Sequence, residues 1–197
     1  MSRTFHSLRY FNFRLWFFGN IIASTGMWMQ RVAQDWLVLT VLTKNSGTQV
    51  GVVTALQFLP ILVLSPWAGL LADRLNRRAL LQAMQLANAL LGLILGVLIL
   101  TNTAQLWHVY VLALLGGVAG AIDSPARQAF VSELVPPVSL SNAVGLNSTA
   151  FNAARLIGPA VSGLLIDVIG TGWVMIVTAV AFFAPVLTLA LMRSADL

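Results

Sequence analysis

Residues 69–78 read GLLADRLNRR, a short polar stretch that lies between two long apolar runs. The stretch combines one acidic residue, Asp73, with three arginines, Arg74, Arg77 and Arg78. A hairpin of two membrane helices needs a hydrated turn of this kind, because irregular backbone is not tolerated against lipid. Clustered arginine also indicates the cytoplasmic side of a bilayer. The stretch therefore predicts a cytoplasmic turn between two membrane-spanning helices.

The composition is typical of an integral, all-α membrane protein. Of 197 residues, 58% are hydrophobic and 9% are charged, whereas soluble domains have about 25% charged residues. Six apolar runs each approach the ~20 residues that cross ~30 Å of hydrocarbon. We expect residues 1–197 to form one six-helix bundle with spans at about 14–42, 50–71, 79–100, 107–122, 141–166 and 173–192.

Several function classes are excluded by the same composition. The net charge of +5 would suit a nucleic-acid binder, but the basic residues flank apolar runs and do not cover one face of a domain. Without cysteine there are no disulfides, thiolate chemistry or cysteine metal sites. We find no histidine cluster, paired catalytic carboxylates or GxSxG-type motif. We therefore expect no enzyme activity, no metal site and no cofactor.

Lysine and arginine are distributed unevenly over the predicted turns. With the N-terminus inside, eight arginines fall in inner segments, and only Lys44 falls in an outer turn. This bias predicts that both termini are cytoplasmic in a cell inner membrane. The inner arginines are Arg3, Arg9, Arg14, Arg74, Arg77, Arg78, Arg127 and Arg193.

A short internal repeat links the second and fifth predicted spans. Residues 66–73 read PWAGLLAD and residues 159–167 read PAVSGLLID, each at the end of its span. Because the two spans cross in opposite directions, the repeat predicts two three-helix units of inverted topology, as in many secondary transporters. A chance match in leucine-rich sequence is the alternative.

The first predicted span carries an unusual polar stripe. A central charge facing lipid costs at least about 2.5–3.5 kcal/mol, so the stripe must face other helices or a wet cavity. One interpretation is a solute pathway with Asp35 as a proton-coupling acid. The alternatives are that Arg31 and Asp35 only pair, or that the span projects beyond the bilayer. The residues within about 100° of one another on the helix are Asn20, Ser24, Met27, Arg31, Gln34 and Asp35.

The fifth predicted span repeats this pattern around Arg155. No acidic residue on the same helix lies within reach of Arg155. If Asp35 neutralises Arg31, Arg155 adds one uncompensated positive charge, which favours an anionic or zwitterionic solute. Backbone carbonyls around Arg155 are the alternative. The residues on its face are Ser148, Asn152, Arg155, Pro159 and Ser162.

The spacing G-x-L-x-D-R-x-N-R-R resembles the signature loop of the major facilitator superfamily, which usually has glycine where Asn76 stands. Asparagine tolerates left-handed backbone better than most residues, so we expect the turn to survive. The fifth span also resembles the family's antiporter motif, with Ala154 and Ser162 in place of two glycines; both are small enough for close helix packing. The matching positions are Gly145, Gly158, Pro159 and Gly163.

The stretch DSPARQAF from Asp123, with NFRLWFFGN and WMQRVAQDWLV near the start, resembles the exporter branch that includes enterobactin exporters and transmembrane secretion effectors. The resemblance implies proton-coupled export of a small molecule (siderophore, drug or metabolite) by alternating access. It also implies a cytoplasmic gate, in which Asp73 contacts the opposing half and Arg77 reaches Asp123 at the inner end of the fourth span. A solvated loop that only fixes orientation is the alternative. The loop residues concerned are Gly69, Asp73, Arg74, Arg77 and Arg78.

Members of this family have twelve spans, so the chain resembles an N-terminal six-helix half. We expect its partners to be the bilayer, protons, a solute and a second six-helix half, which is either a missing C-terminal half or a second copy. The competing hypothesis is an inactive half that serves as a structural or regulatory membrane partner.

Overall fold

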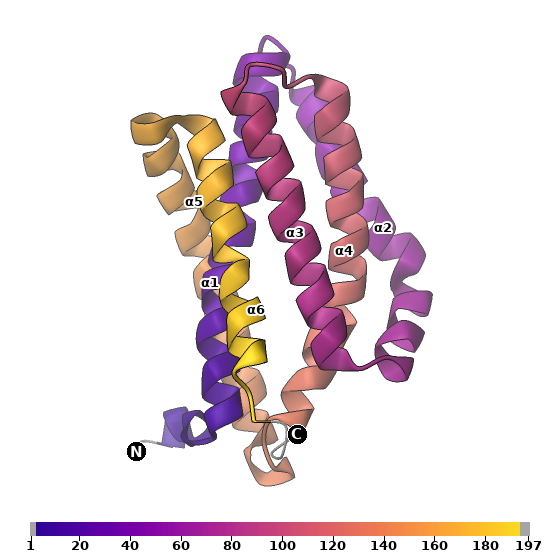
Figure 1. The fold of residues 1–197 in the computed structure, drawn as a ribbon, viewed down its shortest axis with the longest axis vertical. Coiled ribbons are helices and arrows are strands. Elements are labelled where there is room, and N and C mark those ends of the chain that lie inside the picture. Colours follow the sequence, from indigo (N-terminus) through magenta and orange to yellow (C-terminus); the bar gives the residue numbers. More distant parts are fainter. Residues whose placement is uncertain (1–2, 194–197) are drawn as a thin grey trace.

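The computed structural model describes residues 3–193, and every regular element in that range is helical, which confirms the all-α class (Figure 1). The helices lie roughly along one axis, and η1 and the end of α6 lie at the same end of the bundle (Figure 1). The elements are η1 Arg3–Arg9, α1 Phe11–Trp36, η2 Leu37–Leu42, α2 Gly47–Arg74, α3 Arg77–Leu100, α4 Leu106–Glu133, α5 Pro137–Ala181 and α6 Phe183–Ala190.

Four helical runs are long and apolar enough to cross a bilayer, namely α2, α3, α4 and the run Pro137–Ala190 that contains α5 and α6. Helix α1 is not one of them, although it has 26 residues, because its polar stripe lowers its hydropathy. The arrangement of six spans in two inverted repeats stays a prediction.

Helix α5 contains a reversal at Gly170. This residue has φ 80° and ψ 160°, which is non-helical and in a region that glycine adopts without a Cβ clash. The chain turns back at this point and runs down the bundle into α6 (Figure 1). The reversal lies within the turn that the sequence predicts at residues 167–172.

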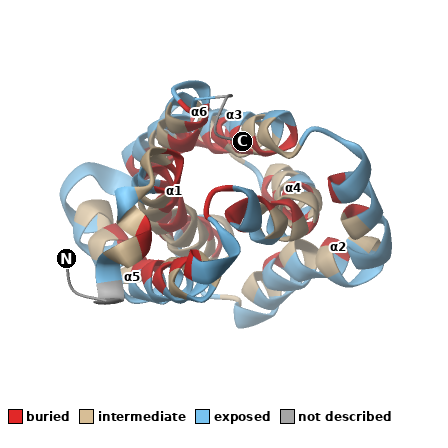
Figure 2. Ribbon diagram, turned by 90° about the horizontal axis from the view of Figure 1, so that it is seen from below, coloured by how far each residue is buried: buried red, intermediate tan, exposed pale blue. Residues whose placement is uncertain are grey.

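The helices pack in pairs, and the two larger of three apolar clusters make up most of the core. Helix α1 lies on α5, α2 lies on α4, and α3 contacts both α4 and α5. One cluster centres on Phe13, Trp16 and Phe130, and the other on Leu37 and Val109. The exposed residues lie mainly on the outer faces of the helices (Figure 2). Many of these exposed residues are large and apolar, as expected of surfaces that face lipid or another bundle.

The fourth helix is longer than the sequence indicated. The prediction ended the span at Ile122 and placed a loop from Asp123, but α4 continues through Pro125 to Glu133. An interior proline removes one backbone hydrogen bond. Here the helix continues because it buries Phe130, which is 1% exposed, in the apolar cluster.

The turn between α2 and α3 does not need left-handed backbone at Asn76. This residue has φ −61° and ψ 109°, and its side chain accepts a hydrogen bond from the backbone N–H of Ala79 at 3.0 Å. Asn76 is therefore the N-cap of α3, a position that asparagine favours. The turn survives for this reason and not for the backbone tolerance expected from the sequence.

Candidate functional site

A cavity of about 420 Å³ lies inside the bundle, with walls from α1, α2, α3, α4 and α5. Its lining combines charged and amide side chains with aromatic rings and small residues. Volumes of this size are typical of small-molecule sites, in which a few polar groups stand in a mostly apolar wall. The charged and amide residues that line it are Gln30, Arg31, Gln34, Gln57, Gln85, Asn88, Asp123, Arg127 and Arg155.

The polar stripe of α1 faces neighbouring helices. Asn20, Ser24 and Gln34 are buried, with 1%, 3% and 5% exposed. The Gln34 amide donates to the backbone carbonyl of Val109 at 3.4 Å and accepts from Gln57 at 3.3 Å. Three helices are thereby joined by amide groups at the cavity wall, because Gln57 is in α2 and Val109 in α4.

Arg31 and Asp35 do not form the ion pair that the sequence allowed. No ion pair between them occurs at 4.0 Å or less, and the Arg31 guanidinium lies over the rings of Trp28 and Phe58, at 4.9 and 5.0 Å. Asp35 is half-buried and is not part of the cavity wall. Its Oδ1 is buried with no hydrogen-bond partner in the part of the chain that the structure covers.

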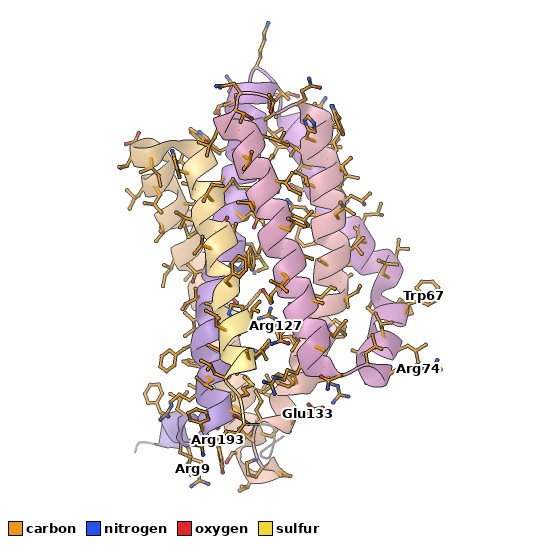
Figure 3. All side chains as sticks on the ribbon, in the orientation of Figure 1. Arg9, Trp67, Arg74, Arg127, Glu133 and Arg193 are labelled. Atoms are coloured by element: carbon orange, nitrogen blue, oxygen red, sulfur yellow. The ribbon has the colours of Figure 1, made fainter. Side chains whose placement is uncertain are left out.

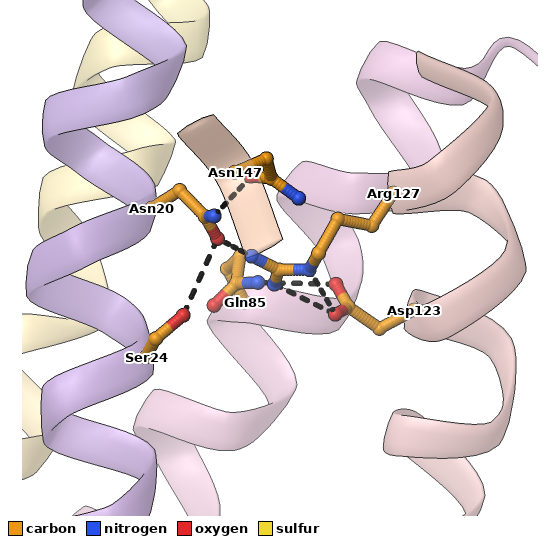
Figure 4. A network of polar contacts seen from close by, with 6 residues as sticks. All are labelled: Asn20, Ser24, Gln85, Asp123, Arg127 and Asn147. Atoms are coloured by element: carbon orange, nitrogen blue, oxygen red, sulfur yellow. Dashed lines mark hydrogen bonds and ion pairs between the residues drawn. The ribbon is translucent and has the colours of Figure 1, made fainter. Parts of the chain in front are cut away.

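A charged network crosses the bundle below these residues (Figure 4). Arg127 donates to Asp123 through Nε at 2.9 Å and Nη2 at 2.7 Å, and it also donates to the Asn20 side chain. Gln85 donates to the other oxygen of Asp123 at 3.0 Å, and Asn20 donates to Asn147 at 2.7 Å. The network therefore joins α1, α3, α4 and α5 through one satisfied ion pair.

Arg127 does not lie in the cytoplasmic loop where the sequence placed it, and the network around it was not predicted. The side chain lies between helices of the bundle (Figure 3). The spacing of Asp123 and Arg127 at i,i+4 was the available signal. It was obscured because the prediction ended the fourth span at Ile122, which placed both residues outside the helix.

Helix α5 packs closely on α1 through one side of the antiporter-like motif. A Cβ at Gly158 would lie 2.6 Å from the Cβ of Trp28, so only glycine fits there. Ala154 and Ser162 are also buried, and the Ser162 hydroxyl donates to the backbone carbonyl of Met29 at 3.0 Å. The small replacements therefore preserve close packing.

The other motif residues of α5 lie away from this contact. Gly145 and Gly163 are exposed, and a Cβ added at either position would meet no atom within 4 Å, while Pro159 is half-buried. Asn152 is exposed and donates to the Ser148 carbonyl, so it does not join the cavity wall. Arg155 does line the cavity, with its guanidinium 5.4 Å from the centre of the Trp28 ring.

The gating-loop residues lie at the end of the bundle that also holds η1, and one predicted contact is wrong. Arg77 pairs with Glu133 and, at 3.3 Å, with Asp73, not with Asp123. The reason is that α4 extends to Glu133, which brings that residue to the loop and leaves Asp123 inside the bundle.

The remaining loop residues differ in their surroundings. Arg78 donates to the Ala190 carbonyl at 3.1 Å and so connects α3 to the end of α6. Arg74 points away from the bundle (Figure 3). Gly69 has open space around it. A hollow of about 480 Å³ at this end is lined by Asp73, Leu75, Asn76, Arg77, Arg78, Phe130 and Glu133.

Within residues 3–193, no group of three or more His, Cys, Asp or Glu side chains is placed to hold a metal ion. The chemistry available in the cavity is therefore that of guanidinium, carboxylate, amide and aromatic groups.

Comparison with known proteins identifies relatives over nearly the whole chain. A family model described as "Transmembrane secretion effector" matches residues 2–196. The "Staphyloferrin A transporter" of Staphylococcus aureus is 31% identical over 175 residues, which are 88% of this chain and 44% of that protein. The "Multidrug efflux pump Tap" of Mycolicibacterium fortuitum is 31% identical over 182 residues, 89% of this chain and 44% of that protein.

A third relative, the "Macrolide efflux protein A" of Streptococcus pyogenes, is 24% identical over 158 residues, which are 79% of this chain and 39% of that protein. The chain thus spans less than half the length of each of these three relatives. Their names describe a transporter, an efflux pump and an efflux protein.

Proposed function

This chain belongs to the transmembrane secretion effector family of major facilitator transporters, and from that premise we propose that it exports a small molecule by alternating access. The observation that carries the proposal is the cavity of about 420 Å³, lined by polar groups of helices whose outer faces are apolar. Charged groups inside membrane helices are energetically unfavourable against lipid, and they mark solute or ion pathways. The relatives' names favour a drug or a siderophore-like metabolite as the solute.

We propose six membrane spans, formed by α1 with η2, by α2, α3 and α4, and by the two arms of α5 on either side of Gly170, the second continued by α6. The reversal at Gly170 supports two separate spans in this run. The repeated PWAGLLAD and PAVSGLLID segments support an inverted pair of three-helix units. A second six-helix bundle, from further chain or from a partner copy, would close the open side of the cavity.

Asp35 is our candidate for proton coupling. Its carboxylate lies one helical turn beyond Arg31, with one oxygen buried and unpartnered in the described structure. A carboxylate without an ion-pair partner can bind and release a proton as its surroundings change between buried and hydrated states. Such a change accompanies the two states of an alternating-access transporter.

We propose that the loop after α2 forms a cytoplasmic gate. In this proposal the protein lies in a cell inner membrane, and both of its termini are on the cytoplasmic side. The Arg77 pairs with Asp73 and Glu133 join α2, α3 and α4 at this end. Ion pairs that form in one state and break in the other bias a two-state equilibrium. The excess of arginine in the inner segments over lysine in the outer turns supports the orientation.

The test is transport in inside-out vesicles under an imposed pH gradient. Labelled macrolide and a labelled siderophore would be offered as solutes, with vesicles lacking the protein as the control. The proposal expects uptake that depends on the protein and collapses when a protonophore removes the gradient. Uptake that persists without the gradient would contradict proton coupling, and no protein-dependent uptake of either solute class would contradict the proposed solute range.

A further inference from the structure

Two arginines of the cavity stand over the same indole ring. The guanidinium of Arg31 lies 4.9 Å, and that of Arg155 lies 5.4 Å, from the centre of the Trp28 ring. One arginine comes from α1 and the other from α5, so the close packing of these helices at Gly158 brings them together. The Trp28 ring thus lies beside guanidinium groups from two different helices.

Neither guanidinium has an acceptor for its N–H groups within residues 3–193. Neither takes part in an ion pair at 4.0 Å or less, or in a hydrogen bond. Stacking on a ring uses only the face of a guanidinium, whereas its five N–H donors lie in the plane. These in-plane donors are therefore free to bind an acceptor.

Arg127 provides the contrast within the same cavity. Its guanidinium is neutralised by Asp123 at 2.7 Å and also donates to Asn20. Asp123 is the only acidic residue in the cavity wall as described, so it leaves Arg31 and Arg155 without a counter-charge there. Arg155 has no acidic partner, and Arg31 has only the longer-range attraction of Asp35, so the two guanidinium groups together keep an excess of positive charge that attracts an anion.

The indole of Trp28 adds a further unused donor. Its Nε1 is buried and has no hydrogen-bond partner in the described part of the chain. Buried donors are nearly always paired, so this N–H is available to an acceptor that enters the cavity. The surrounding wall also contains the rings of Phe58, Phe151 and Phe182. The site thus combines donors for an anionic group with an apolar surface for the remainder of a ligand.

We propose that Arg31, Arg155 and Trp28 form an anion-binding site that takes a carboxylate or phosphate group of an amphipathic solute. Guanidinium groups bind both kinds of anion through paired N–H donors, which lysine cannot reproduce. The proposal deepens the proposed export function and rests on its solute pathway. The two arginines would bind the anionic group of the solute, and the aromatic rings would contact its apolar part.

The test measures binding by the purified protein in lipid nanodiscs. Citrate and inorganic phosphate serve as separate probes, so that the two anion chemistries are distinguished, and tetraphenylphosphonium serves as a cationic probe. The readouts are calorimetry and the change in intrinsic tryptophan fluorescence. Trp28→Phe should remove most of the fluorescence response, because the proposed site contacts that indole.

Arg31→Gln and Arg155→Gln should each weaken binding of at least one anion by about tenfold or more, the loss expected for one charge-assisted hydrogen bond. Arg31→Lys should also weaken it, because lysine keeps the charge but loses the paired donors. The matched control is Arg14→Gln, which removes the same charge from an exposed position outside the cavity and should leave the affinity unchanged. An unchanged chromatographic profile and circular dichroism establish that each variant is folded.

The proposal is overturned if the folded wild type binds neither anion, or if the Arg31→Gln/Arg155→Gln double variant binds both anions as tightly as the wild type. It is also overturned if tetraphenylphosphonium binds more tightly to the wild type than to that double variant. Arginine-dependent anion binding without any transport would leave the site intact and refute the proposed export. Transport that is unaffected in the double variant would refute the site and leave the export function standing.

Discussion

The ion pair between Asp123 and Arg127 allows a prediction whose size follows from the structure. We expect Asp123→Asn to destabilise the folded bundle far more than Glu133→Gln, although each removes one carboxylate from an arginine. The side chains of Arg127 and Asp123 are 17% and 13% exposed, whereas those of Arg77 and Glu133 are 26% and 38% exposed. Because the first pair is more buried, its loss should lower the stability of the folded protein more.

Breaking a buried pair by removing one partner costs about 3–5 kcal/mol, because the remaining charge stays uncompensated. We expect the lower end, about 3 kcal/mol, since Arg127 still donates to Asn20 and its side chain is 17% exposed. For a chain of this length, that loss lowers Tm by about 6–12 °C. The exposed pair at Glu133 should contribute less than about 1 kcal/mol.

The assay is thermal unfolding in detergent, followed by the fraction of monodisperse protein after heating. A double-mutant cycle with Arg127→Gln and Asp123→Asn isolates the interaction between the two side chains. We expect the double variant to be more stable than the sum of the single losses predicts, because no unpaired charge is left. Equal effects of Asp123→Asn and Glu133→Gln, or a cycle without coupling, would refute the reasoning.

Three further variants test other parts of the account. Gly158→Val should cost about 1–3 kcal/mol or more, because its Cβ would lie 2.6 Å from that of Trp28, and heating assays should report the loss. Asp73→Asn should abolish transport but not membrane insertion, since Asp73 is 70% exposed and contributes little to stability. Asp35→Asn should leave the protein folded but remove the response of transport to a pH gradient, measured in vesicles.

Each of these three predictions has an outcome that would contradict it. Gly163→Ala should be neutral, because a Cβ there meets nothing within 4 Å; a Gly158→Val protein as stable as this control would contradict the close α1–α5 packing. Full transport by Asp73→Asn would remove its role in the gate. A pH-gradient response retained by Asp35→Asn would move proton coupling to another residue.

The helical class and the polar face of α1 could be predicted because both depend on local patterns. A run of apolar residues has few alternatives in a membrane, and a stripe that repeats with the helical period must face one side. The burial of Asn20, Ser24 and Gln34 follows from this argument. The sequence was sufficient to predict burial wherever the helical period of the polar residues determined which face of a helix they occupied.

The pairings could not be predicted, because they depend on where helices end and how they are rotated against one another. The prediction ended the fourth span at Ile122, which placed Asp123 at the edge of a loop within reach of Arg77 and hid its pair with Arg127. In the structure α4 continues through Pro125. Packing of Phe130 in the core outweighs the cost of that proline. Likewise, Arg31 lies over aromatic rings of α1 and α2, an arrangement that depends on contacts between helices.

The central claim is that the charged residues of these helices surround a watery cavity and do not face lipid. The chain has no cysteine, so single cysteines can be introduced and labelled with a membrane-impermeant maleimide. Gln57→Cys and Ser124→Cys lie in the cavity wall, whereas Leu90→Cys and Val180→Cys lie on outer faces, where the native side chains are 56% and 63% exposed. The account predicts rapid labelling of the cavity pair and slow labelling of the outer pair in native membranes. Cavity cysteines that react no faster than the outer pair would contradict it.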